Sequence, residues 1–312
     1  MTTFAKALCL AALACISGFS APAMAEVIPV SGIYPAQNDD AIGVNTIAIE
    51  NFGGEMGTSL SFAVSDALRN VVIERERWFE VVPVTGGTIA PDAVMRGTVN
   101  TEAERVRVKD RVKTECVSED KDGKCLKEED VTYWCRTLTV TFRPEVRLIA
   151  ETGELLAVMD RVSTRSATYC QDDKNRPSED AMTREMIAEF ADNARRELAP
   201  VAVRETVRVL EVRDGVRKED QKALKAAIKL TKRDIAGACR AFAALEAGNP
   251  ASPSVLFNIG LCAERQGDLE MASSYYSRAL QVDARKPHVS QGLDRLAARR
   301  RAEQQLAVHF GG

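Results

Sequence analysis

Residues 137–156, TLTVTFRPEVRLIAETGELL, contain the clearest structural signal in this 312-residue chain. Apolar and polar residues alternate from 137 to 148, with Pro144 as the exception. A period of two is the pattern of a β-strand with one buried face. The ETG at 151–153 predicts a three-residue hairpin loop, because its glycine suits the left-handed position there. A return strand is therefore expected over residues 155–169.

Strands and helices alternate on both sides of this hairpin. The predicted strands are NTIAIENF (45–52), FEVVPV (79–84), AVMRGTV (93–99) and VRETVRVLEV (203–212). Apolar residues at helical spacing predict a helix from Glu55 to about Glu76, and a second helix from Ser178 that ends at Pro200. We therefore expect residues 45–212 to form one α/β domain with a mixed sheet and flanking helices.

Several short phrases in this domain carry a family resemblance. A strand followed by Gly53-Gly54 and an amphipathic helix precedes RWFEVVP, VMRGTV, RLIAETGELL and a late helix. This order resembles the CsgG-like envelope domain, a relative of the TolB N-terminal and LpoB domains. The resemblance covers about 170 residues and implies a non-catalytic assembly or regulatory module of the bacterial cell envelope. Some members of the group form a secretion pore in the outer membrane.

The pore-forming members place membrane strands where this chain reads EAERVRVKDRVKTECVSEDKDGKCLKEEDVTYWC, residues 102–135. Val106, Val108 and Val112 alternate with basic residues, but Asp110 interrupts the apolar face. Residues 127–130, all charged, lie on the return strand. A membrane strand needs roughly 9–11 residues with an apolar lipid face. We therefore expect a charged, solvated hairpin or loop, with a membrane hairpin as the alternative.

The first 25 residues are typical of an export signal. Lys6 precedes an apolar run over residues 7–19, and Ala23 and Ala25 supply the small residues of a cleavage site before Glu26. Acylation at Cys15 is the alternative, although residues 12–14 are an imperfect lipobox. Residues 26–44 are expected to be an N-terminal extension. The predicted location is the periplasm, with association to the outer membrane as a variant.

Six cysteines lie beyond the signal, and export to an oxidising compartment favours disulfides. The tip residues between Cys116 and Cys125 include Asp122-Gly123, a turn signal, so these two are expected to pair. If ETG is the hairpin loop, facing residues have numbers that sum to 304. Cys135 and Cys170 sum to 305, so one bulged residue on the return strand would bring them together, and Pro144, which does not fit a regular ladder, favours a bulge there. The competing pattern is Cys125–Cys135 with Cys116–Cys170.

The C-terminal third contains two similar helical segments. In the second, small and aromatic residues recur at helical spacing: Gly260, Ala263, Gly267, Ala272, Tyr276, Ala279 and Leu280. Ala238, Phe242 and Pro250 precede Ala272, Tyr276 and Ala284 by 34 residues. This pattern resembles the tetratricopeptide repeat, which has that period. The first repeat departs from the pattern at the inter-helix glycine, where Arg233 stands, and the second lacks the final proline.

The resemblance implies an all-α repeat module over residues 221–312, joined to the α/β domain by a linker at 213–220. A helix at about 290–307 is expected to cap its end. Repeats of this kind bind peptides or proteins on a concave face. A small packing module without a ligand is the alternative. Cys239 and Cys262 would lie on neighbouring helices. A disulfide between them and two buried free thiols are the two alternatives.

The sequence offers little material for catalysis. Walker-type phosphate loops and Gly-x-Ser-x-Gly elbows are absent, and the only histidines are His288 and His309, which we expect on the surface. No Cys-x-x-Cys pair suggests zinc, and no cofactor is expected. A net charge of −3 argues against nucleic-acid binding.

The sequence therefore predicts a non-catalytic periplasmic scaffold or adaptor that binds protein or peptide partners at the cell envelope. The alternative is an oligomeric CsgG-like assembly or secretion subunit of the outer membrane, and an envelope enzyme is the third reading. No transmembrane segment is expected in the mature chain. A homo-oligomer is compatible with either of the first two functions.

Overall fold

The computed structural model describes residues 26–84, 90–283, 285 and 287–311. The expected export signal and Cys15 lie outside the described residues. The chain divides into two compact units, and neither is one continuous stretch. The α/β unit comprises residues 31–205 and 290–312, and the helical unit comprises residues up to 30 and 206–289. The architecture is thus mixed α/β plus helical, as expected.

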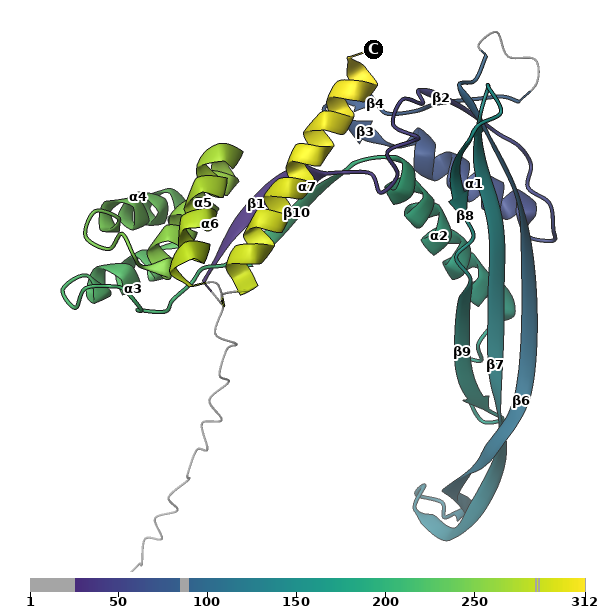
Figure 1. Ribbon diagram of the computed structural model, residues 1–312. Helices are drawn as coiled ribbons and strands as arrows, with labels where there is room; N and C mark the ends of the chain where they lie inside the picture. The colour runs from purple at the N-terminus through teal and green to yellow at the C-terminus, as the bar shows by residue number, and fades with distance from the viewer. Residues whose placement is uncertain (1–25, 85–89, 284, 286, 312) are drawn as a thin grey trace, which may run out of the picture. The chain divides into compact units, whose positions relative to one another are not determined.

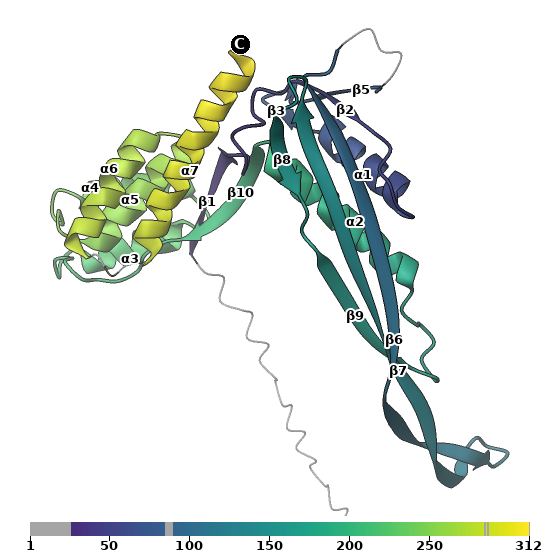
Figure 2. The ribbon, with the colours of Figure 1, turned by 45° about the vertical axis from the view of Figure 1, so that its right-hand side comes forward.

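The α/β unit is built on a mixed sheet in which β2 runs parallel to β5 and β6, and the other pairs are antiparallel. The strand order is β5-β2-β6-β7-β8, and β9 also pairs with β7. The bounds are β2 (Thr46–Ile49), β5 (Glu80–Val82), β6 (Ala93–Glu119), β7 (Cys125–Ala150), β8 (Leu155–Met159) and β9 (Ser163–Cys170). Figures 1 and 2 show that β6 and β7 run far beyond the other strands.

Helices α1 (Gly57–Arg69) and α2 (Glu179–Leu198) contact each other and cover one face of this sheet. Leu138, Val140 and Phe142 of β7 are at most 1% exposed, and Phe142 meets Phe190 of α2. Ser178 caps α2 by accepting a hydrogen bond from the Ala181 amide. The alternation of residues 137–148 is therefore that of a strand with one buried face.

The first helix is shorter than predicted. It ends at Arg69, whereas the periodic apolar residues extend to Val72. A tight hairpin follows, in which β3 (Val72–Ile73) pairs with β4 (Glu76–Arg77). Its two turn residues, Glu74 and Arg75, have φ values of 52° and 76°. This left-handed backbone is incompatible with a helix, so the prediction to Glu76 was wrong.

The hairpin loop at residues 151–153 is confirmed. Gly153 has a φ of 88°, and the Ala150 amide donates to the Glu154 carbonyl at 2.8 Å. The predicted register, however, is off by one residue, because Leu148 pairs with Ala157 while Ile149 pairs with Leu155. The bulge is therefore next to the loop rather than near Pro144. The Leu156 carbonyl in this bulge accepts a hydrogen bond from the Asn38 side-chain amide at 2.9 Å.

Pro144 explains why the expected return strand is split into β8 and β9. The Val99 amide points away from β7, to the Gly53 carbonyl at 2.9 Å, and Val99 pairs with Pro144. Along a strand, the backbone N–H and C=O groups of successive residues point alternately toward one neighbouring strand and toward the other. The backbone groups of Val99 and of Pro144 opposite it therefore point away from each other, and those of Pro144 point toward β8 and β9. Proline has no amide hydrogen to donate there. The ladder is accordingly interrupted between Val146↔Met159 and Phe142↔Ser163.

The helical unit contains two helical hairpins. Its helices are α3 (Gln221–Leu230), α4 (Ile235–Leu245), α5 (Pro253–Gln266) and α6 (Leu269–Val282). Gly267 ends α5 with a φ of 85°, and Asp268 caps α6. A β-carbon on Gly260 would lie 2.8 Å from the Tyr276 ring, so glycine permits the close packing of α5 on α6.

The expected linker at 213–220 is part of the helical unit and packs against the chain between α4 and α5. The Arg217 amide donates to Asn249 at 2.8 Å, and a β-carbon on Gly215 would lie 2.3 Å from the Ala251 carbonyl oxygen. Leu210 lies just before this segment. Its backbone exchanges two hydrogen bonds of 2.9 Å with the buried side chain of Asn258 in α5. These contacts hold the segment before α3 against α5 and the loop that precedes it.

Helix α7 (Pro287–Phe310) differs from the expected repeat cap, because from Ser290 onward it belongs to the α/β unit. Gln305 bonds both backbone groups of Ala36, and Arg301 pairs with Asp39 at 2.9 Å. The predicted extension at 26–44 is likewise structured, since β1 (Val27–Tyr34) pairs with β10 (Val201–Arg208).

The prediction that His309 lies on the surface was wrong. His309 is 6% exposed and stacks on Trp78 with ring centroids 3.6 Å apart. Its two ring nitrogens lie 2.7 Å from the Ile42 carbonyl and 2.8 Å from the Trp78 carbonyl. The polar composition of the helix concealed this contact, which involves only one side of its last turns. His288 is exposed, as expected.

Candidate protein-binding arm

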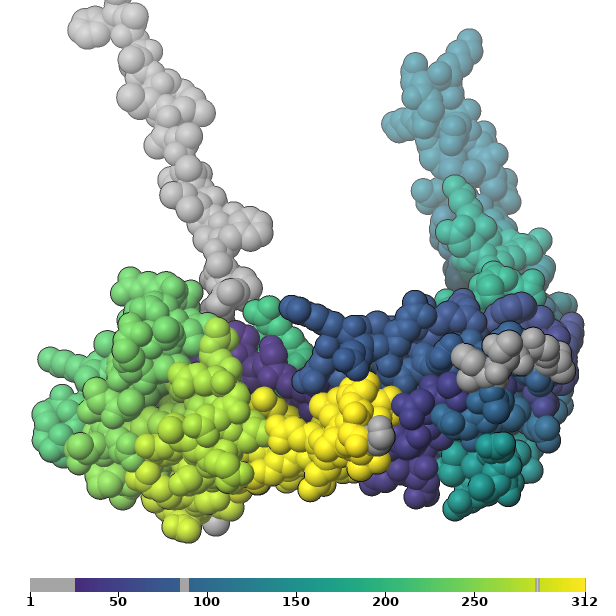
Figure 3. Space-filling view, turned by 90° about the horizontal axis from the view of Figure 1, so that it is seen from above, coloured from purple at the N-terminus to yellow at the C-terminus, as the bar shows by residue number. Residues whose placement is uncertain are grey.

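The longest strands continue beyond the sheet as an isolated two-stranded ribbon. Strand β9 ends where Cys170 pairs with Cys135. Beyond this point β6 and β7 pair only with each other among the described strands. We call residues 109–134 the arm, and Figure 3 shows that it projects from the rest of the α/β unit. A two-stranded ribbon without a core needs additional constraints, because such hairpins are marginally stable.

A disulfide and a hydrogen-bonded turn close the distal end of the arm. Cys116 is bonded to Cys125. The Asp120 carboxylate accepts from the backbone amides of Asp122 at 2.9 Å and Lys124 at 2.8 Å. Gly123 has a φ of 76°, which suits glycine in this turn. The tip is therefore a defined turn rather than a long loop.

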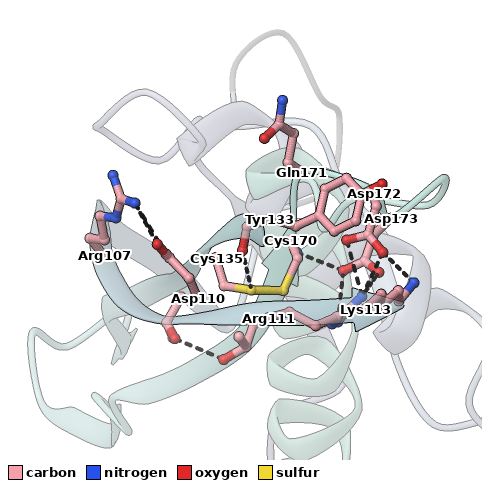
Figure 4. Close-up of a disulfide and its surroundings, with 12 residues drawn as sticks. Arg107, Asp110, Arg111, Lys113, Tyr133, Cys135, Cys170, Gln171, Asp172 and Asp173 are labelled. Carbon is pink, nitrogen blue, oxygen red and sulfur yellow. Dashed lines mark hydrogen bonds and ion pairs between the residues drawn. A yellow bond between two sulfur atoms is a disulfide. The ribbon is translucent and has the colours of Figure 1, made fainter. Parts of the chain in front are cut away.

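The base of the arm is held by a second disulfide and a group of charges, shown in Figure 4. Cys135 and Cys170 are bonded across adjacent strands, and both are nearly inaccessible to solvent. Asp173 accepts from the Cys170 amide at 2.6 Å and binds Arg111 at 2.7 Å. Asp172 binds Arg111 at 3.2 Å and also pairs with Lys113. The chain after β9 therefore clamps β6 at its exit from the sheet.

These contacts favour the charged forms of Arg111, Asp172 and Asp173. Hydrogen bonding from Lys113 lowers the pKa of the Asp172 carboxyl, and hydrogen bonding from Arg111 lowers that of Asp173. Asp173 in turn raises the pKa of the Arg111 guanidinium. The two carboxyls and the guanidinium are thus ionised throughout the neutral range.

Trp134 marks the end of the packed part of the hairpin. Its ring meets Tyr169 edge-on, with centroids 6.3 Å apart. The guanidinium groups of Arg136 and Arg176 lie 5.1 and 5.6 Å from the ring centroid. The Trp134 carbonyl also accepts from the Gln171 amide at 2.9 Å. The clamp therefore includes an aromatic contact stabilised by two cations.

A cavity of about 210 Å³ lies where the ladder is interrupted opposite Pro144. Its apolar floor includes Phe142, Met159, Met186 and Phe190, and its rim includes Asp160, Arg161, Glu189 and Glu197. The lining residues contain no histidine, cysteine or lysine to pair with a nucleophile. Within the described part of the chain, no three His, Cys, Asp or Glu residues are grouped to hold a metal ion.

The structure brings together the expected disulfide pairs Cys116–Cys125 and Cys135–Cys170. Cys239 and Cys262, for which the sequence leaves two states open, are bonded and join α4 to α5. The expected packing residues Ala238, Phe242, Ala272 and Tyr276 are fully buried, with Gly260 against Tyr276 and Gly267 at the end of α5.

The clamp residues Arg111, Lys113, Asp172 and Asp173 were missed by the sequence analysis. Gln-Asp-Asp directly follows Cys170, and Arg-Val-Lys lies near the strand position opposite Cys135. The pairing of the two cysteines was the available signal, because it places these charges at one end of the sheet.

None of the helices in the described part of the chain combines the length and apolar character needed to cross a bilayer. No family model matches the chain, and no curated protein matches it. Among solved structures, the chain is similar to a dodecamer of a PelC variant from Paraburkholderia phytofirmans. The similarity covers 54% of this chain and 97% of that chain, with 17% identity and a TM-score of 0.22. This score is too low to support a conclusion about fold or assembly.

Proposed function

We propose that this protein is a non-catalytic scaffold or adaptor that binds protein partners in the bacterial periplasm. The arm is the observation that carries the proposal. It is a solvated ribbon constrained at both ends by disulfides, which are typical of exported proteins. Constraint lowers the entropy lost when such a ribbon binds a partner.

The finer assignments belong to the same proposal. The mixed sheet with two helices on one face agrees with a CsgG-like domain. Two helical hairpins, with Gly260 against Tyr276, agree with a short tetratricopeptide module. In this module α5 is enclosed, since Asn258 holds Leu210 and Arg265 donates to the Pro29 carbonyl at 2.8 Å. Partner binding by the helical unit would therefore use surfaces other than the buried sides of α5.

A shortened arm tests the proposal. Val112 and Thr132 face each other in the ladder, so Asn-Gly can replace residues 113–131 as a two-residue turn. The complete exported chain and the shortened chain would be compared by cross-linking in the envelope of the producing cell. We expect defined cross-linked products that the shortened chain loses, with an unchanged thermal unfolding midpoint.

Replacement of Glu151-Thr152-Gly153 by Asn-Gly is the matched control, because it shortens the other hairpin loop of the same sheet. This control should keep the cross-linked products. Retention of all products by the shortened arm would refute the proposed role of the arm.

The second candidate is a CsgG-like assembly or secretion subunit. It is favoured by the long β6–β7 hairpin at the position where pore-forming members send strands into the membrane. Light scattering of the mature chain, with and without detergent, tests it. A ring-sized oligomer that partitions into detergent would favour this candidate, and a monomer excluded from detergent micelles would rule it out.

A further inference from the structure

The two faces of the arm differ in charge, and the strand register defines them. Val112 faces Thr132, Thr114 faces Asp130, and Cys116 faces Glu128. Beyond Glu128 the ladder shifts register, and Leu126 stands at this irregularity between Glu128 and Cys125, whose disulfide to Cys116 joins it to this face. We call this set the acidic face of the arm: Val112, Thr114, Cys116, Leu126, Glu128, Asp130 and Thr132.

The acidic face combines exposed apolar groups with carboxylates. Val112 is 58% exposed and Leu126 is 65% exposed. Glu128 and Asp130 are both exposed, and Asp130 accepts a hydrogen bond from Thr114 at 2.7 Å. The seven residues include no lysine or arginine. Arg136 and Arg176, at the base of the arm, lie over the Trp134 ring.

The opposite face of the arm includes Arg111, Lys113, Glu115, Lys127, Glu129 and Tyr133, and carries charges of both signs. The cations Arg111, Lys113 and Lys127 of this set are each in an ion pair, since Arg111 and Lys113 bind Asp172 and Lys127 binds Glu129 at 2.5 Å. Glu115 on this face accepts from the Tyr133 hydroxyl and raises the pKa of that phenol. The opposite face is therefore internally satisfied, whereas Glu128 of the acidic face has no ion-pair partner among the described residues.

We propose that the acidic face binds a protein surface on which lysine or arginine residues flank an apolar patch. The inference rests on the proposed role of the arm and specifies its partner. Two exposed aliphatic side chains supply the apolar contact, and the two carboxylates select the sign of the partner's charge. Nucleic acids and anionic lipid headgroups carry the wrong charge. A second copy of this face would oppose carboxylates to carboxylates.

The probe is a fluorescein-labelled peptide, acetyl-(Lys-Val)4-amide, which in extended form presents lysine on one face and valine on the other. Binding to the mature full-length chain is measured by anisotropy. The charge control is acetyl-(Glu-Val)4-amide, and phosphatidylglycerol vesicles test a lipid source. We expect binding of the lysine peptide only, and weaker binding at high salt because exposed charges are screened.

Two charge variants identify the face. Glu128→Lys with Asp130→Lys changes the acidic face, and Glu115→Lys with Glu129→Lys makes the same change in net charge on the opposite face. We expect at least a tenfold loss of peptide affinity in the first pair and less than a threefold loss in the second. Leu126→Asn should weaken binding about fivefold. Unfolding midpoints and the tip disulfide must be unchanged in all variants.

Equal effects of the two charge variants would overturn the inference, as would no binding of the lysine peptide or binding to the vesicles. The two sets of variants together distinguish failure of this inference from failure of the proposed function. If the shortened arm loses its envelope partner and the Glu128→Lys, Asp130→Lys chain keeps it, only the acidic-face inference fails. If the shortened arm keeps the partner, both fail.

Discussion

The same two strands are held in two different ways along one hairpin. Near the loop at residues 151–153, β6 and β7 lie under α1 and α2, and alternate side chains are buried in a core. In the arm, neither face is covered, and the strands are held by disulfides at both ends and by the clamp around Asp172. The first half depends on apolar burial, and the second depends on covalent and ionic constraints.

The difference shows that strand pairing does not require a core when the ends of a ribbon are fixed. It also separates stability from function within one element. Substitutions under α2 should affect the folding of the whole unit, whereas substitutions in the arm should change local order or binding. Four experiments test this separation.

Phe142→Ala should have the largest effect. The ring is 1% exposed and contacts Phe190, so its removal leaves a cavity between sheet and helix. We expect a loss of about 3–5 kcal/mol in the free energy of unfolding. Denaturant unfolding of the full mature chain, followed by circular dichroism, measures it. A loss below about 1 kcal/mol would show that the covered half is not held by its core.

Replacing Cys135 and Cys170 together by alanine should come next. This disulfide lies at the border of the two halves and restricts the unfolded chain, so we expect a loss of about 2–4 kcal/mol. The same denaturant series measures it. Single alanine variants, which leave one thiol, serve as controls and should lose about as much. Unchanged stability in the double variant and both single variants would show that this disulfide lies outside the part of the unit that unfolds cooperatively.

Acid should loosen the clamp. The pKa values of Asp172 and Asp173 are lowered in the folded chain, so their contribution is complete above the ordinary carboxyl pKa. It is lost as the pH falls through the lowered folded-state values, below about 4. Arm amides should then exchange hydrogen faster, after correction for intrinsic rates, while amides under α2 stay protected. In Asp172→Asn with Asp173→Asn, the extra exchange should already be present at neutral pH.

Opening the tip should have the smallest effect on global unfolding. Replacing Cys116 and Cys125 by serine removes a bridge in a region without a core, so we expect a change below about 0.5 kcal/mol. Hydrogen exchange within residues 111–133 should nevertheless increase. A large global loss would mean that the arm unfolds together with the sheet.

Much of the fold follows from local patterns. The alternation at 137–148, the glycine of the 151–153 loop and the capping residue Ser178 each act within a few positions, and the structure agrees with them. The bulge at Leu148/Ile149 was misplaced, because its stabilising contact comes from Asn38, more than one hundred residues away. The clamp and the docking of His309 on Trp78 were missed for the same reason. Their partners are distant in sequence and have no periodic signal.

The assignment of α7 to the α/β unit has a consequence for synthesis of the chain. The chain enters the helical unit, passes to the α/β unit, returns to the helical unit and finishes in the α/β unit. The α/β unit therefore cannot complete its packing around Trp78 until the residues near His309 have been synthesised. Neither unit corresponds to a contiguous gene segment, so recombination at a single boundary cannot transfer one without damaging the other.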